Sequence, residues 1–215
     1  MPQIFPEWTN RLPIIAAVLA AGGLIAGVGF FWYFGSPAFT DVGYRPRQPV
    51  EYSHKRHAGD LGMDCRYCHT AVEKAAFAGI PPTQTCMNCH KLVLPDSEKL
   101  LKVRESWASG KPIEWVRIHN LPDYSYFDHS IHLNAGVGCE SCHGNVAQME
   151  RVTLTKPLSM GWCLDCHRNP DPQLRQPEEV TQMNWKPGPD HAEFASRLKA
   201  EKNIKPSEDC SICHR

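Results

Sequence analysis

The feature that most constrains this chain is one pattern, C-x-x-C-H, which occurs five times and uses all ten cysteines. The five copies are Cys65-Cys68-His69, Cys86-Cys89-His90, Cys139-Cys142-His143, Cys163-Cys166-His167 and Cys210-Cys213-His214. One helical turn places two such thiols and the adjacent imidazole against the same planar group. In c-type cytochromes the thiols form thioethers with the porphyrin and the histidine ligates the iron. The sequence therefore predicts five haem c groups, each with the histidine of its motif as proximal ligand.

Composition and spacing exclude other classes of protein. A zinc protein would show paired C-x-x-C units, and a disulfide scaffold has no reason to follow every second cysteine with histidine. Lys plus Arg and Asp plus Glu are equal at 23 each, so the electrostatic footprint of a nucleic-acid binder is absent. A disordered chain is disfavoured because 42% of the residues are hydrophobic.

The N-terminal region contains a hydrophobic run, residues 14–34, of 21 residues without a charge. At about 1.5 Å per residue it spans roughly 30 Å, the hydrocarbon thickness of a bilayer, so it predicts a transmembrane anchor helix after a short N-terminal segment, residues 1–13. The alternative is a cleaved secretory signal ending near Ser36-Pro37-Ala38, but signal cores are shorter, about 7–15 residues.

The predicted topology follows from the haem motifs, because the charges that flank the hydrophobic run are too few to orient it. C-type haem is attached outside the cytoplasm. We therefore expect residues 1–13 in the cytoplasm, residues 35–51 as a linker, and residues 52–215 as a periplasmic pentahaem domain of a protein in the cytoplasmic membrane.

A second repeat supplies candidates for the other axial ligands. An H-x-x-H pair, His54 and His57, stands seven residues before Cys65, and a second pair, His129 and His132, stands six residues before Cys139. Each pair is followed by two haem motifs. The chain thus contains two similar modules, 52–90 and 127–167, with a fifth haem at 210–214. Because two imidazoles on one face cannot ligate one iron from the same side, each pair is expected to serve two haems.

The fifth haem needs one further ligand, and the residues leave three candidates. His119 ends a strand-like stretch, residues 113–118. His191 begins a predicted helix capped at Asp190, where a core or capping role explains it equally well. Met183 is a reserve ligand that would raise the potential of its haem relative to histidine.

The predicted fold class is a multihaem cytochrome c, mostly irregular, with short α-helices packed around five haems and one N-terminal transmembrane helix. Frequent proline and glycine leave room only for short helices such as 96–109. Residues 168–189, rich in proline and glutamine, are expected to form either an extended arm over a neighbouring subunit or a plain linker.

The H-x-x-H arrangement resembles that of the small class III multihaem cytochromes. In that family the first histidine ligates the haem that follows and the second ligates another haem. The resemblance implies that His54 serves the first haem and His129 the third, with His57 and His132 serving neighbouring haems.

A longer resemblance, from about residue 47 to 215, is to the pentahaem subunit of bacterial alternative complex III. Its motifs are Ser53-His54, Asp64-Cys65-Arg66-Tyr67-Cys68-His69-Thr70, Ile80-Pro81-Pro82-Thr83-Gln84-Thr85-Cys86-Met87-Asn88-Cys89-His90, Val103-Arg104-Glu105-Ser106, Trp115-Val116-Arg117-Ile118-His119 and Leu158-Ser159-Met160-Gly161-Trp162-Cys163-Leu164-Asp165-Cys166-His167-Arg168. The resemblance implies a quinol-oxidising membrane complex with an iron–sulfur subunit, NrfD-like membrane subunits and a monohaem cytochrome c. It also favours His119 over His191 as the fifth distal ligand.

The expected function is therefore electron transfer from such a complex through five haems to a periplasmic acceptor, with no catalytic residue in this chain. Eleven histidines can close all five irons with one to spare, which disfavours a catalytic reductase with an open iron position. The nearer alternative is a membrane-anchored quinol dehydrogenase of the NapC/NrfH type, which would bind quinol itself.

Overall fold

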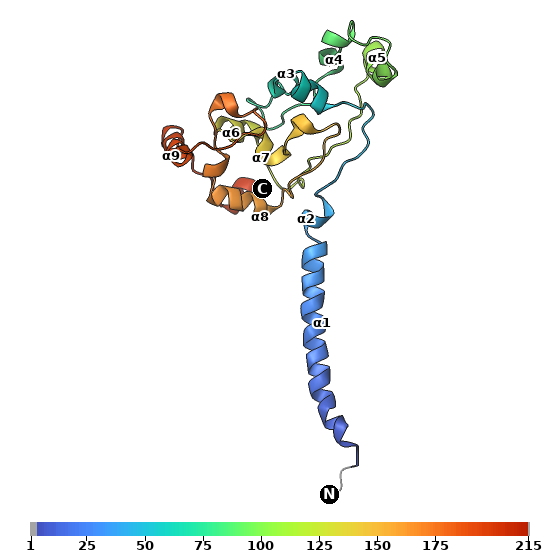
Figure 1. The fold of residues 1–215 in the computed structure, drawn as a ribbon, viewed down its shortest axis with the longest axis vertical. Coiled ribbons are helices and arrows are strands. Elements are labelled where there is room, and N and C mark those ends of the chain that lie inside the picture. Colours follow the sequence, from blue (N-terminus) through green and yellow to red (C-terminus); the bar gives the residue numbers. More distant parts are fainter. Residues whose placement is uncertain (1–3, 215) are drawn as a thin grey trace. The chain divides into compact units, whose positions relative to one another are not determined.

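The computed structural model describes residues 4–214. It divides the chain into two compact units, with the boundary between Asp41 and Val42. Each unit is built from helices and irregular segments (Figure 1).

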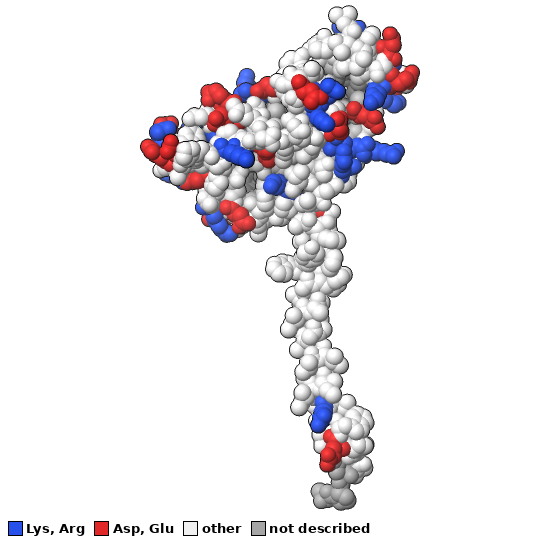
Figure 2. Space-filling view, viewed as in Figure 1, with Lys and Arg blue, Asp and Glu red and all other residues white. Residues whose placement is uncertain are grey.

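The first unit is dominated by one long helix. A 3-10 turn, η1 (Glu7–Arg11), leads into α1 (Leu12–Phe34), and a short helix, α2 (Pro37–Thr40), follows. Pro13 stands in the first turn of α1, where its missing N–H costs no hydrogen bond. The segment Glu7–Phe34 is long and apolar enough to cross a membrane, and Figure 2 shows an uncharged surface along α1.

The second unit contains short helices joined by irregular segments. In chain order they are the π-helical turn η2 (Lys55–Asp60), α3 (Cys65–Cys68), α4 (Thr83–His90), η3 (Glu98–Leu100), α5 (Leu101–Ser109), α6 (His129–Asn134), α7 (Cys139–His143), η4 (Val146–Gln148), α8 (Met160–Arg168), η5 (Asp171–Gln173), η6 (Pro177–Glu179), α9 (His191–Glu201) and α10 (Cys210–Cys213). The predicted helix over 96–109 is present as η3 and α5, and the helix after Asp190 is present as α9.

Extended segments do not assemble into a sheet within residues 4–214, where pairing is limited to two isolated bridges, Ser125 with His214 and Val137 with Leu174. The strand-like stretch 113–118 is held instead by a side chain. The Gln48 amide donates to Val116 O and accepts from Val116 N, both at 2.9 Å. This amide satisfies the backbone groups that a partner strand would otherwise pair.

Among residues 4–214, most of the buried apolar side chains gather in three small clusters. Val50, Met87 and Val103 form the first, Val72, Leu133 and Val180 the second, and Leu174, Ala195 and Leu198 the third. A unit of this length ordinarily buries one continuous apolar core. Small separate clusters in place of one continuous core are the expected property of a chain folded around large planar groups.

The two predicted modules interlock. Gly59 of η2 lies against the backbone of Ala147 in η4, and the Lys55 N–H donates to Met149 O at 3.0 Å. Residues 42–51 of the predicted linker also belong to this unit: the Gly43 N–H donates to Leu154 O at 2.8 Å, and Val50 is buried.

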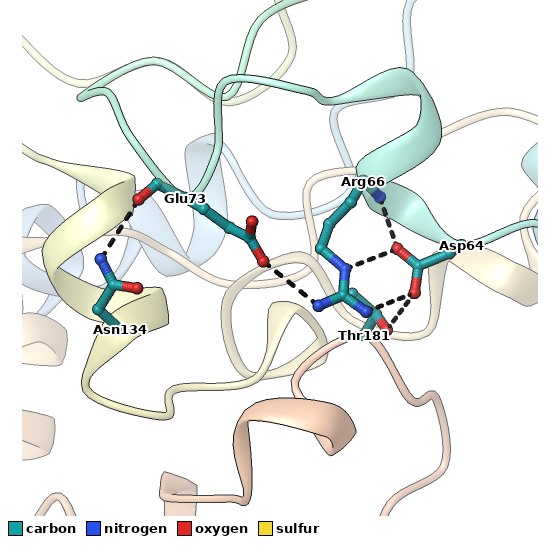
Figure 3. Close-up of polar contacts among 5 residues, drawn as sticks. All are labelled: Asp64, Arg66, Glu73, Asn134 and Thr181. Carbon is teal, nitrogen blue, oxygen red and sulfur yellow. Dashed lines mark hydrogen bonds and ion pairs between the residues drawn. The ribbon is translucent and has the colours of Figure 1, made fainter.

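A polar network joins the first haem motif to distant parts of the unit (Figure 3). Asp64 caps α3 and accepts two hydrogen bonds from the Arg66 guanidinium, each at 2.9 Å. Arg66 also bonds Glu73, whose backbone carbonyl accepts from Asn134 of α6, and Thr181 donates to Asp64. The Arg66 hydrogen bonds lower the pKa of Asp64 to about 2, so this carboxylate stays charged at neutral pH.

The expectation of an arm or linker at 168–189 is wrong. Leu174 and Val180 are among the most buried residues, and the Arg175 N–H donates to Gly136 O at 2.8 Å. The Arg175 guanidinium is itself buried, 4.6 Å from the centroid of the Trp185 ring. This segment therefore folds back onto its own chain and forms part of the core.

Candidate haem-binding sites

Every C-x-x-C-H motif lies on a short helix, namely α3, α4, α7, α8 or α10. Capping side chains start three of them: Asp64 accepts from Arg66 N, Ser159 from Trp162 N and Asp209 from Ser211 N. Each helical turn brings its two cysteines onto one face, and all ten thiols are free. This is the arrangement of thiols that two thioether bonds per motif would use.

The motif histidines are oriented through Nδ1. In four of them this nitrogen lies within hydrogen-bond distance of a backbone carbonyl: His69 to Gly79 O at 2.7 Å, His90 to Val93 O at 2.9 Å, His167 to Ser207 O at 2.7 Å and His214 to Tyr124 O at 3.2 Å. A ring that donates through Nδ1 carries its lone pair on Nε2, the nitrogen that binds a metal. These contacts fix both the tautomer and the ring orientation that an iron ligand requires.

The H-x-x-H histidines show the same arrangement. His57 Nδ1 lies 2.8 Å from Ser53 O and His132 Nδ1 lies 2.8 Å from Asp128 O, in each case four residues earlier. His129 Nδ1 lies 2.7 Å from Ala76 O of the other module. His54 differs, since its Nδ1 is buried without a hydrogen-bond partner.

Three of these histidines face motif histidines across a distance that suits one metal ion. The ring centroids of His57 and His90 are 6.2 Å apart, those of His129 and His143 6.3 Å, and those of His132 and His167 6.1 Å. A metal–imidazole bond is about 2.0 Å long and the centroid lies about 1.1 Å behind the nitrogen, so imidazoles on opposite faces of one ion have centroids about 6.2 Å apart. The spacing of all three pairs therefore fits bis-histidine haem iron.

Burial keeps the clustered imidazoles neutral, which is the ligating form. It lowers the pKa of His54 to about 4, with help from nearby His69 and His57. It lowers the pKa of His143 to about 3, with a smaller contribution from the neighbouring His119, and that of His119 to about 4.

The candidates for the fifth distal ligand lie in different surroundings. His119 stands beside the third motif, with its Nε2 3.2 Å from His143 Nδ1, while the ring next to His214 is that of Tyr124. His191 Nε2 lies 2.7 Å from Asp171 O, so the ligating nitrogen of that ring is engaged. Met183 lines a cavity of about 350 Å³ together with Cys65. The Nε2 atoms of both His119 and His191 are thus engaged, and the fifth distal ligand stays a prediction.

Comparison with known proteins places the chain among cytochromes. Residues 125–215 match the family described as cytochrome c7 and related cytochrome c. The multiheme cytochrome c subunit of menaquinone reductase from Nitratidesulfovibrio vulgaris is 33% identical over 169 residues, which cover 68% of this chain and 79% of that protein. The chain belongs to the multihaem cytochrome c family. Membership implies c-type haem, and the thiols and imidazoles of this multihaem cytochrome form a donor set that fits it.

The sequence of this multihaem cytochrome did not indicate that Arg175 lies near the third haem motif. The Arg175 guanidinium is 96% buried, lies 3.8 Å from Glu140 and donates to Gln182 O at 2.8 Å. It thereby places a positive charge beside Cys139 of the third motif. Only the long-range fold brings Arg175 there, because 36 residues separate it in sequence from Cys139.

Proposed function

We propose that this multihaem cytochrome is the electron-transfer subunit of a quinol-oxidising membrane complex of the alternative complex III type, and that it carries five haem c groups. The observation that carries the proposal is the pairing of histidines at 6.1–6.3 Å. An iron closed by two histidines has no open position for a substrate, so it can only accept and donate electrons.

The haems would be held by the ten cysteines and by His69, His90, His143, His167 and His214. Bound haem supplies one-electron redox chemistry. We assign the opposite ligands from their neighbours: His57 faces His90 of the second motif, His129 faces the third motif and His132 the fourth, and His54, the neighbour of His69, is assigned to the first. His119 is proposed as the fifth distal ligand.

We propose that α1 is a membrane anchor with the N-terminus in the cytoplasm and the haem domain in the periplasm. Its length and its uncharged surface support this assignment. An anchor of this kind would keep the haem chain beside membrane subunits that handle quinone. The proposed partners are an iron–sulfur subunit, NrfD-like membrane subunits, a monohaem cytochrome c and a periplasmic electron acceptor.

The name of the N. vulgaris relative, a subunit of a menaquinone reductase, favours a second candidate in which electrons flow toward the quinone. A chain of bis-histidine haems conducts in either direction, because the flow follows the potentials of the donor and acceptor. The two candidates therefore share one role for this chain and differ in the reactions at its two ends.

The test uses the complex purified from membranes with this subunit intact. Menaquinol should reduce the haems within the complex, whereas isolated subunit mixed with the same menaquinol should stay oxidised. Direct reduction of the isolated subunit would instead support a NapC/NrfH-type quinol dehydrogenase. If menaquinol leaves the haems of the complex oxidised, and pre-reduced complex passes electrons to menaquinone, the second candidate is correct.

A further inference from the structure

An aromatic ring stands two residues before each H-x-x-H pair and contacts both of its histidines. In the first module the Tyr52 ring stacks on His57, with centroids 4.5 Å apart and planes 23° apart. The same ring contacts His54 edge-on, with ring centroids 4.8 Å apart and an angle of 88° between the ring planes. One side chain thus touches two imidazoles that are assigned to different haems.

The second module repeats this geometry with phenylalanine. Phe127 lies 4.5 Å from His132 with planes 31° apart, and 4.8 Å from His129 with planes 85° apart. The centroid distances are the same in the two modules, and the interplanar angles differ by less than 10°, although the two segments are 75 residues apart. The hydroxyl group of Tyr52 is therefore not what the arrangement requires. The shared element is the ring.

The ring constrains the planes of the two imidazoles. Since it is nearly parallel to one histidine and nearly perpendicular to the other, it holds the pair at a steep mutual angle. Aromatic contacts of these two geometries are favourable beyond the burial of area, and so they select one ring orientation. A hydrogen bond at Nδ1 alone leaves a ring free to tilt about the N···O axis.

The two modules differ in how much else supports the histidines. In the second module both His129 and His132 have a carbonyl at Nδ1, from Ala76 and Asp128. In the first module His57 has Ser53 O, but His54 has no Nδ1 partner. The Tyr52 ring is thus the principal side-chain contact that orients His54, whereas Phe127 is one support among several.

We propose that Tyr52 and Phe127 are positioning residues that set the imidazole planes, and hence the ligand fields, of two haems in each module, with the largest effect at the haem served by His54. This inference rests on the proposed function, because it takes the H-x-x-H histidines as distal ligands. It adds to that function two aromatic residues that ligate no iron, each of which sets the orientation of two iron ligands.

The test compares four purified, haem-loaded proteins: the wild type, Tyr52→Leu, Phe127→Leu and the matched control Tyr52→Phe. Leucine removes the ring but stays apolar, and phenylalanine keeps the ring but removes the hydroxyl. A pyridine haemochrome assay counts the haems in each. Electron paramagnetic resonance of the ferric protein then reads the angle between axial imidazole planes through the g values of each low-spin signal.

We expect Tyr52→Leu to shift two of the five low-spin signals, the larger shift belonging to the first haem, and Phe127→Leu to shift two others by less. Tyr52→Phe should reproduce the wild-type spectrum. The inference is overturned if leucine at position 52 leaves all signals in place, or if phenylalanine there shifts them as leucine does. Should Tyr52→Leu fail to load five haems, Phe127→Leu decides, and unchanged signals in that variant overturn the proposal.

The same experiment separates this inference from the proposed function. Wild-type protein with fewer than five low-spin haems would contradict the proposed function itself. Five low-spin haems in the wild type, together with unshifted spectra in both leucine variants, would contradict only the positioning role.

Discussion

Replacing Gly136 with alanine should weaken the attachment of the 168–189 segment to the second module. Gly136 has φ +96°, and an added Cβ would lie 2.6 Å from Arg175 O and 3.2 Å from a methyl carbon of Leu198. The Gly136 carbonyl also accepts the hydrogen bond from Arg175 N at 2.8 Å. The new methyl group would therefore clash with the Arg175 carbonyl and disturb the adjacent backbone hydrogen bond.

The magnitude follows from three contributions. The left-handed conformation costs alanine about 1–2 kcal/mol, overpacking against backbone costs about 1–3 kcal/mol, and weakening the Arg175 hydrogen bond costs about 1 kcal/mol. Gly43 provides a matched control, because it has the same φ of +96° and nothing within 4 Å of its added Cβ. Gly43→Ala should cost only the conformational strain.

The assay is guanidinium chloride unfolding of the detergent-solubilised, haem-loaded protein, followed by the Soret band. Gly136→Ala should lower the free energy of unfolding by about 2–4 kcal/mol more than Gly43→Ala does. Equal losses in the two variants, within about 0.5 kcal/mol, would refute the packing described for residues 168–189.

Two further predictions concern pH and the anchor. Burial lowers the pKa of His54 from 6.5 to about 4, so between these values the unfolded chain binds a proton that the folded chain lacks, and stability is lost as pH falls. The free energy of unfolding should therefore be lower at pH 5 than at pH 7.5 by about 2 kcal/mol for this histidine, and equal values in denaturant titrations would contradict the assignment. Replacing residues 1–41 by a cleavable secretion signal should release a haem-loaded protein into the soluble periplasmic fraction, as judged by haem staining, and recovery in the membrane pellet would show that α1 is not the sole anchor.

Much of this architecture could be predicted because it depends on local spacing. A hydrophobic run of bilayer length predicts α1, and the cysteine and histidine spacings predict short helices at all five motifs. The H-x-x-H pairs lie on single turns, as expected, because residues three apart share a helical face.

Long-range contacts account for what could not be predicted. Nothing local in residues 168–189 indicates that Leu174 becomes fully buried, since its neighbours across space come from α9 and from Val137. In the same way, Gln48 supports residues 113–118 from 68 positions away, in place of the strand partner that the local sequence suggests.

The central claim is that five haem irons in this chain are each closed by two protein ligands. The most direct measurement is a pyridine haemochrome count on the purified protein combined with near-infrared magnetic circular dichroism, which identifies the axial ligands of low-spin ferric haem. The account predicts five haems, all low-spin, with bis-histidine ligation at no fewer than the four that the H-x-x-H pairs serve. Fewer than five haems, or a high-spin haem that binds carbon monoxide when reduced, would contradict it.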